Sequence, residues 1–109
     1  MTAAGFRRMA LALPEATEGA HMGHADFRVR NKIFATLDET ETLGMVKLNP
    51  EQQHEFVKAQ PEMFVPVKGG WGRKGATHVR LAATDERALA KALGIAWRNT
   101  APKSLASHV

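Results

Sequence analysis

Gly70, Gly72 and Gly75 stand at the spacing of a dinucleotide-binding loop, and the residues after them constrain the fold most. Such a loop holds a pyrophosphate where it joins a strand to a helix, because the helix N-terminus supplies positive charge. Here Gly75 is followed by "ATHVRLA" (residues 76–82), which alternates apolar or β-branched residues with His78 and Arg80 and so predicts a strand. The segment also fails the P-loop pattern, because Ala76 and Thr77 follow Gly75 where Lys and then Ser or Thr are needed, so the Lys is missing. We therefore predict a hairpin-like connection and not a phosphate cradle.

The length and composition favour one cytoplasmic globular domain. A chain of 109 residues has room for one modest core, and 44% of its residues are hydrophobic. The lack of cysteine excludes disulfides, thiolate metal sites and cysteine nucleophiles. Arg7 and Arg8 precede "MALALP", but this apolar run is too short for a signal peptide and predicts a first helix of a cytoplasmic protein. No segment approaches the length of a membrane span.

The net charge of +4 is unevenly distributed along the chain. Residues 1–41 hold five Lys and Arg against six Asp and Glu, whereas residues 42–109 hold ten against five. This asymmetry favours a polyanionic partner for the second part of the chain. The alternative is that a charge of this size serves only solubility.

Hydrophobic spacing predicts a single order of elements in one domain, residues 1–109. Helices are expected over residues 2–13, 50–60 and 85–97, begun by Thr2, by Asn49 with Pro50, and by Thr84. Residues 17–48 predict three or four strands, residues 63–68 a short extended piece, and residues 76–82 a further strand. The order predicts an α+β fold, a two-layer sandwich in which helices pack on an antiparallel sheet. The tail after residue 102 is expected to fray.

The strands of this sheet predict one core face and one solvent face. Successive strand residues alternate between the faces, so the apolar members define the core face. We assign to it Phe27, Val29, Ile33, Ala35, Leu37, Val46, Leu48, Val79 and Leu81. The opposite face then receives Arg28, Arg30, Phe34, Thr36, Met45, Lys47, His78 and Arg80. Cations that share a surface can bind several phosphates, although exposed sheet faces also carry Lys and Arg for solubility and cross-strand pairing.

The glycine segment adds an aromatic residue and further cations to the candidate interface. Trp71 stands between two glycines beside Arg73 and Lys74, and Lys68 precedes the segment. An aromatic ring can stack a base while adjacent cations bind phosphates. Alternatively, Trp71 folds back as a plug over the sheet edge, with the glycines supplying the backbone freedom. The other tryptophan, Trp97, lies on the apolar stripe of the last helix and is expected in the core.

Four segments together carry a resemblance to known proteins: "LALPEATEGAHMGHADFRVRNKIFATL", "MVKLNPEQQ", "GGWGRKGATHVRL" and "ALAKALGIAWRNTAPKSL". They extend from about Leu11 to Leu105 and resemble the MmcQ/YjbR-like family of small bacterial proteins. The resemblance implies a frataxin-like fold with a double-wing motif, for which DNA binding has been proposed. The wings would be the hairpin from Arg28 to Lys32 and the loop formed by residues 69–75. The family supplies no catalytic residues to assign to this chain.

The stretch "HMGHAD" is the best metal candidate on spacing, with His21, His24 and Asp26. Two imidazoles and a carboxylate can form a facial metal site. In a strand, however, His21 and His24 would point to opposite faces unless Gly23 bends the chain. The acidic ridge of frataxin-like proteins is also missing, since the first helix holds two arginines and no acid. We therefore expect neither a metal nor a cofactor.

No pairing of a nucleophile with a base stands out, so the sequence favours a binding module over an enzyme. We predict a nucleic-acid-binding domain, with DNA the expected form, that acts as a monomer or weak dimer and binds no membrane. The candidate interface consists of Arg28, Arg30, Lys32, Lys47, Lys68, Trp71, Arg73, Lys74, His78 and Arg80. The alternative is a module that binds an anionic small molecule or an acidic protein on the same face.

Overall fold

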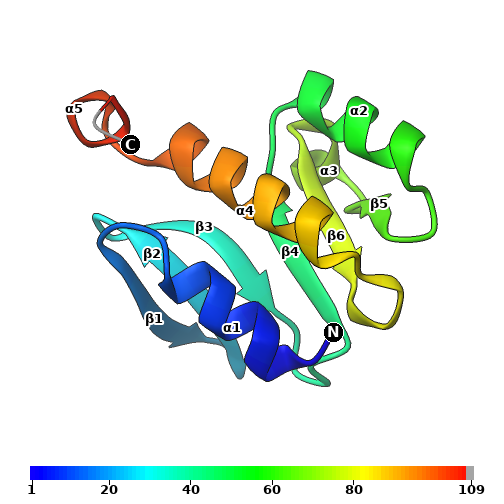
Figure 1. Ribbon diagram of the computed structural model, residues 1–109, viewed down its shortest axis with the longest axis horizontal. Helices are drawn as coiled ribbons and strands as arrows, with labels where there is room; N and C mark the ends of the chain where they lie inside the picture. The colour runs from blue at the N-terminus through cyan, green and yellow to red at the C-terminus, as the bar shows by residue number, and fades with distance from the viewer. Residues whose placement is uncertain (108–109) are drawn as a thin grey trace.

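The computed structural model describes residues 1–107, apart from the side chain of His21, and is built around an antiparallel sheet (Figure 1). The sheet has six strands in the order β1-β2-β3-β4-β6-β5. The strands are β1 (Ala16–His21), β2 (His24–Val29), β3 (Lys32–Leu37), β4 (Leu43–Lys47), β5 (Phe64–Pro66) and β6 (Ala76–Arg80). The helices are α1 (Ala3–Leu11), α2 (Pro50–Ala59), α3 (Gly70–Arg73), α4 (Glu86–Thr100) and α5 (Lys103–Ala106), with a 3-10 turn at Leu81–Ala83. The predicted α+β sandwich is confirmed.

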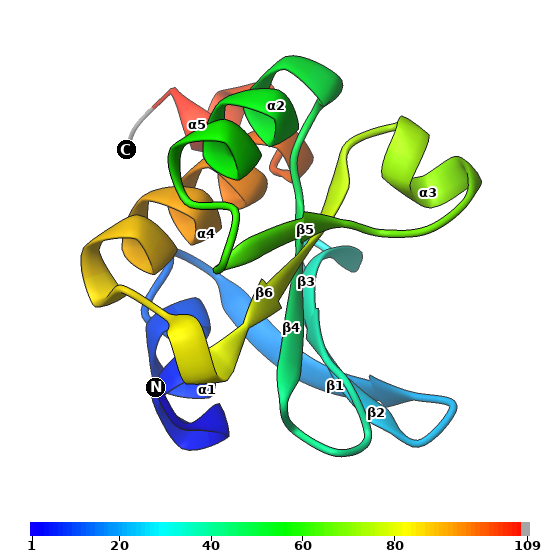
Figure 2. The same cartoon turned by 90° about the vertical axis from the view of Figure 1, so that its right-hand side faces the viewer.

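Helices α1 and α4 lie on one side of the sheet, and α3 lies on the other side (Figure 2). Helix α4 packs on β3 and β4, α1 packs on β1, and α2 packs on β5. Trp97 of α4 is 1% exposed, as predicted for a core residue, and its Nε1 donates a hydrogen bond to the Pro14 carbonyl at 2.9 Å. The described helices include none that is long and apolar enough to cross a lipid bilayer.

An extra residue in β3 changes the expected assignment of the sheet faces. Phe27 pairs with Ala35 and Arg28 pairs with Ile33, so Phe34 has no partner on β2. This β-bulge turns Phe34 into the core, where it is fully buried. It leaves Ile33 half-buried beside Arg28 on the solvent face of the sheet, which we call the open face. The prediction that placed Ile33 in the core and Phe34 on the solvent face was therefore wrong. The other predicted core residues are buried.

The helix caps agree with the prediction except at α4, and the end of the chain also differs from it. Thr2 and Asn49 cap α1 and α2, accepting hydrogen bonds from backbone N–H groups at 3.0 and 2.8 Å. Helix α4 is capped by Asp85 and not by Thr84, whose hydroxyl instead donates to the backbone of residue 80. The tail that was expected to fray after residue 102 forms the short helix α5, in which Leu105 packs against the core.

Candidate functional site

The segment from Gly69 to Gly75, which we call the glycine loop, joins the antiparallel strands β5 and β6. The strand predicted after it is confirmed, but the loop contains the helical turn α3 in place of a simple hairpin turn. A Cβ on Gly72 would overlap the Val67 carbonyl, and one on Gly75, where φ is +115°, would overlap the backbone of Leu48. The glycine spacing therefore serves the close packing of this loop against the ends of β4 and β5.

Gln53 of α2 attaches the glycine loop to the rest of the molecule. Its side-chain Nε2 donates to the carbonyl oxygens of Gly72 and Ala76, each at 2.9 Å. These two carbonyls lie at either end of the segment that leads from α3 into β6. The loop backbone is therefore held in one position relative to α2.

Asn99, near the end of α4, connects that helix to β4 and α2. Its Nδ2 donates to the Lys47 carbonyl at 3.0 Å and to Gln52 Oε1 at 2.8 Å. Gln52 also completes the capping box with Asn49 at the start of α2. These contacts fix the end of α4 and the start of α2 in one region around the end of β4.

The turn between β2 and β3 lies on the other side of this region. Arg30 and Asn31 both have positive φ, 51° and 67°, as in the tight turns that connect hairpin strands. The Arg30 guanidinium binds the Glu15 carboxylate at 2.5 and 3.0 Å. The hydrogen bonds from Arg30 lower the pKa of Glu15 below its ordinary value. Lys32, at the start of β3, makes no ion pair with any residue that the structure describes.

Arg28 lies on the open face, as predicted, but its charge is matched by a buried carboxylate. Its Nε and Nη2 donate to the two oxygens of Asp26 at 2.8 and 3.0 Å, and the Asp26 side chain is 1% exposed. The hydrogen bond to Asp26 raises the pKa of the Arg28 guanidinium above its ordinary value. An arginine engaged in this way is less available to a phosphate than an unpaired lysine.

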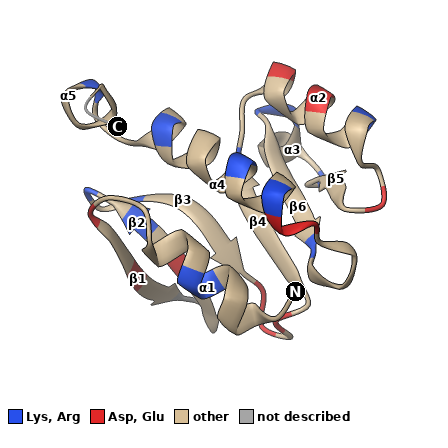
Figure 3. Cartoon of the chain, in the orientation of Figure 1, with Lys and Arg blue, Asp and Glu red and all other residues tan. Residues whose placement is uncertain are grey.

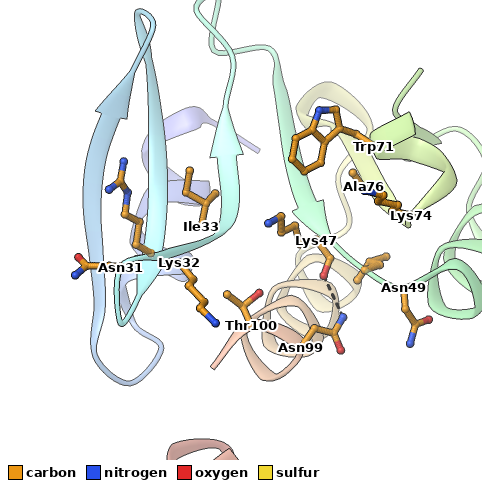
Figure 4. A pocket seen from close by; sticks show the side chains of 12 residues that line it. Asn31, Lys32, Ile33, Lys47, Asn49, Trp71, Lys74, Ala76, Asn99 and Thr100 are labelled. Carbon is orange, nitrogen blue, oxygen red and sulfur yellow. Dashed lines mark hydrogen bonds between the residues drawn. The ribbon is translucent and has the colours of Figure 1, made fainter. Parts of the chain in front are cut away.

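A cleft of about 870 Å³ separates the β2–β3 turn from the glycine loop (Figure 4). Its lining residues are Arg28, Asn31, Lys32, Ile33, Lys47, Leu48, Asn49, Trp71, Lys74, Ala76, Asn99 and Thr100. The lining contains no Asp or Glu, and Lys32, Lys47 and Lys74 make no ion pair within the described part of the chain. The cleft, which we call the basic cleft, therefore presents unneutralised positive charge.

Trp71 forms part of the glycine-loop side of the basic cleft (Figure 4). The residue is 65% exposed, which contradicts the interpretation of Trp71 as a plug over the sheet edge. The Lys47 ammonium lies over its ring, 5.7 Å from the centroid, in a cation–π contact. An exposed aromatic ring and an unpaired lysine are thus neighbours in the same cleft.

The structure brings together only part of the predicted interface. Arg28, Lys32, Lys47, Trp71 and Lys74 line the basic cleft. The other predicted residues do not line it: Arg30, Lys68, Arg73, His78 and Arg80. Among these, the imidazole of His78 has a buried Nδ1 without a hydrogen-bond partner among the described residues.

Several lining residues were not predicted as part of the interface. Asn31 and Asn49 have clear local signals, but these signals indicate a turn and a helix cap. Asn99 and Thr100 carry no sequence signal for the site, because α4 reaches the cleft only through its packing on β3 and β4. Ile33 reaches it only through the β-bulge.

The histidines of the metal candidate lie at the opposite end of β2 from this cleft. A two-residue turn, Met22 and Gly23 with positive φ, places His21 and His24 at paired positions of β1 and β2. The chain therefore bends at Gly23, which is the exception that the sequence argument allowed, and the His21 side chain is outside the described residues. Within the described part of the chain, no group of three or more His, Cys, Asp or Glu is placed to hold a metal ion.

Comparison with known proteins relates the chain to one family and one fold. The family model described as YjbR matches residues 11–99. A crystal structure of a Deinococcus radiodurans protein with the family-model domain DUF419 superposes with a TM-score of 0.74. The two chains are 18% identical, and the match covers 90% of this chain and 77% of the other, so the likeness concerns the fold alone. No curated protein matches the chain.

Proposed function

This chain belongs to the YjbR family, and we propose that it is a non-enzymatic cytoplasmic module that binds nucleic acid, DNA above all, through the basic cleft. In this proposal the β2–β3 turn and the glycine loop contact the phosphate backbone from two sides. They are the same two segments that the family resemblance implies as wings.

The observation that carries the proposal is the convergence of unpaired lysines on one cleft. Lys32, Lys47 and Lys74 come from β3, β4 and the glycine loop, so they are brought together only by the fold. No described carboxylate lines the cleft, and Asp26 and Glu15 are bound to Arg28 and Arg30 of the neighbouring hairpin. Clustered cations without acidic partners are the electrostatic signature of a phosphate-binding surface.

The chemistry of the lining favours binding over catalysis. A general base at neutral pH requires an imidazole or a carboxylate in most enzymes, and the residues that line the basic cleft include neither. The lining offers ammonium, guanidinium and amide donors together with one aromatic ring. These groups bind and orient an anion without activating a nucleophile.

The volume of the cleft favours a second candidate, an anionic small molecule. Sites for small ligands measure about 300–1,000 Å³, and the basic cleft falls in this range. A polyanion would bind with strong dependence on salt and little dependence on sequence, whereas a small ligand would bind once per chain and raise the melting temperature. An acidic protein partner would use the same cations and would be salt-sensitive too.

Fluorescence anisotropy with labelled single- and double-stranded DNA and RNA, at several salt concentrations, tests the proposal. The combined variant Lys32→Ala, Lys47→Ala and Lys74→Ala should weaken binding to all sequences. For duplex DNA, it should flatten the slope of log affinity against log salt by up to about 3 units, since each phosphate contact contributes about 0.9. Wild-type protein that binds no nucleic acid at low salt would overturn the proposal.

A matched control variant tests whether the position of the removed positive charge matters, or only its amount. Lys58, Lys91 and Lys103 are exposed and lie outside the cleft, so replacing all three by alanine removes the same charge elsewhere. The control variant should retain most of the affinity of wild type. Equal losses in the two triple variants would mean that net charge, and not the cleft, attracts the nucleic acid.

A further inference from the structure

We propose that the basic cleft binds one unpaired nucleotide of a single strand, with its base stacked on Trp71 and its phosphates bound by the surrounding lysines. The inference rests on the proposed function and specifies the form of the ligand. The preferred partner is then a single strand, or a base that has left its duplex, and not an intact double helix.

The exposure of Trp71 is the first support. The fold leaves Trp71 65% exposed, and the glycines on either side of it carry no side chain that could cover the ring. The Lys47 ammonium lies over the ring. A cation–π contact in water is weaker than the stacking of a base on an aromatic ring. A base can therefore replace the ammonium on the ring, and Lys47 can turn toward a phosphate.

The shape of the cleft is the second support. Trp71 and Ile33 stand on opposite sides of it, one on the glycine loop and one on the β2–β3 hairpin (Figure 4). Within a duplex, both faces of each base are covered by neighbouring bases. Only an unpaired or extruded base can present a face to Trp71. The cleft volume of about 870 Å³ suits a ligand of nucleotide size.

The polar groups of the walls are the third support. The side chain of Asn31 makes no hydrogen bond with any described residue, and an amide offers both donors and acceptors to the edge of a base. Lys32 and Lys74 stand on opposite sides of the cleft (Figure 4). They are therefore placed to bind the phosphates that precede and follow one nucleotide.

The two tryptophans of the chain provide an internal probe for this arrangement. Trp71 is 65% exposed and Trp97 is 1% exposed, so a base stacked in the cleft quenches the emission of Trp71 and not that of Trp97. Titration with an oligothymidylate of about twelve nucleotides, within the length that single-strand sites accommodate, should quench the protein fluorescence in a saturable manner. Trp71→Phe should bind the same strand within about threefold of wild type but lose the quenching, because phenylalanine still stacks a base.

Trp71→Ala measures the contribution of stacking to affinity. It should weaken oligothymidylate binding by about 5- to 150-fold, which corresponds to one lost stacked base, and leave binding to a duplex of equal length within about twofold. Wild type should bind the single strand more tightly than this duplex at equal salt, although the duplex carries the denser charge. Met22→Ala is the control, because Met22 is an exposed apolar residue outside the cleft, and it should change neither affinity.

The outcomes distinguish a failure of this inference from a failure of the proposed function. If Trp71→Ala binds the single strand like wild type while the triple lysine variant does not, the nucleotide site is wrong and the proposed function stands. The same conclusion follows if wild type prefers the duplex. If thymidine monophosphate binds as tightly as the oligothymidylate, an anionic small-molecule site replaces the single-strand site. If wild type binds no nucleic acid even at low salt, both proposals fail.

Discussion

Gly72 is the residue at which the glycine loop passes closest to the chain that follows β5. Replacing it by alanine forces the new methyl group into the Val67 carbonyl, so the backbone has to shift. Overpacking of this kind costs about 1–3 kcal/mol, and we expect Gly72→Ala to lose at least that free energy of unfolding in urea. Gly94→Ala is the control, because a Cβ there meets no heavy atom within 4 Å and alanine is about 1 kcal/mol better than glycine inside a helix. Equal stability of Gly72→Ala and wild type would contradict this packing.

The local sequence pattern was sufficient to reject a phosphate cradle, because that conclusion needs only the strand predicted after Gly75. It was not sufficient to predict what the glycines contact. The carbonyl that approaches Gly75 belongs to Leu48, which lies far from it in the sequence, and no local pattern reports such a contact. The exposure of Trp71 was undetermined for the same reason. A ring between two glycines can turn inward or outward, and the packing of the loop decides which.

At the scale of elements, Asp38 organises the turn between β3 and β4. Its carboxylate accepts hydrogen bonds from the backbone N–H groups of Thr42 and Leu43 at 3.0 and 3.1 Å and from the Thr40 hydroxyl at 2.9 Å. Burial alone would raise the pKa of Asp38. The hydrogen bonds from Leu43, Thr40 and Thr42 outweigh that effect and lower the pKa below its ordinary value.

This lowered pKa predicts a pH-dependent contribution to stability. A carboxyl whose pKa falls on folding stabilises the native state above its unfolded pKa, and the contribution is lost as the pH falls through the folded value. Asp38→Asn should therefore cost about 1 kcal/mol near neutral pH, and its difference from wild type should shrink below about pH 4. Urea unfolding at several pH values measures this. Glu39→Gln is the control, because the Glu39 side chain accepts no hydrogen bond from this turn; a difference that does not change with pH would contradict the prediction.

Elements with strong local signals were predicted, and those without them were not. Helix α2 follows from Asn49 with Pro50, and the short extended piece predicted at residues 63–68 contains β5, whereas α3 is too short for hydrophobic periodicity to indicate it. The bulge in β3 is one residue long, yet it exchanges the faces of Ile33 and Phe34. The basic cleft is lined by the ends of β4 and α4 and by two loops. The alternation of side chains within strands therefore predicted only some of its cations.

Across the whole molecule, the uneven charge of the sequence is reflected in the places where ion pairs form. The ion pairs between two described residues lie within residues 1–41, where acids and bases are nearly equal in number, as in the pairs Arg7–Glu18 and Arg30–Glu15. Figure 3 shows basic positions along α4 and near the β2–β3 turn, with acidic positions at the turn between β3 and β4. Residues 42–109 hold the excess of Lys and Arg, which includes Lys47 and Lys74 of the basic cleft, and these two lysines make no ion pair with a described residue.

The distribution of exposed apolar side chains predicts a monomer. Among the described residues, the large exposed apolar side chains are Leu11, Met22 and Trp71, which come from α1, the β1–β2 turn and the glycine loop. Single residues spread in this way do not form the continuous apolar surface of a stable dimer interface. Sedimentation equilibrium should therefore give a mass of about 11.9 kDa throughout the micromolar range. A mass of twice this value that persists on dilution would contradict the prediction, and the unpaired edge of β1 would then be the first contact to test, because exposed strand edges pair readily with a second chain.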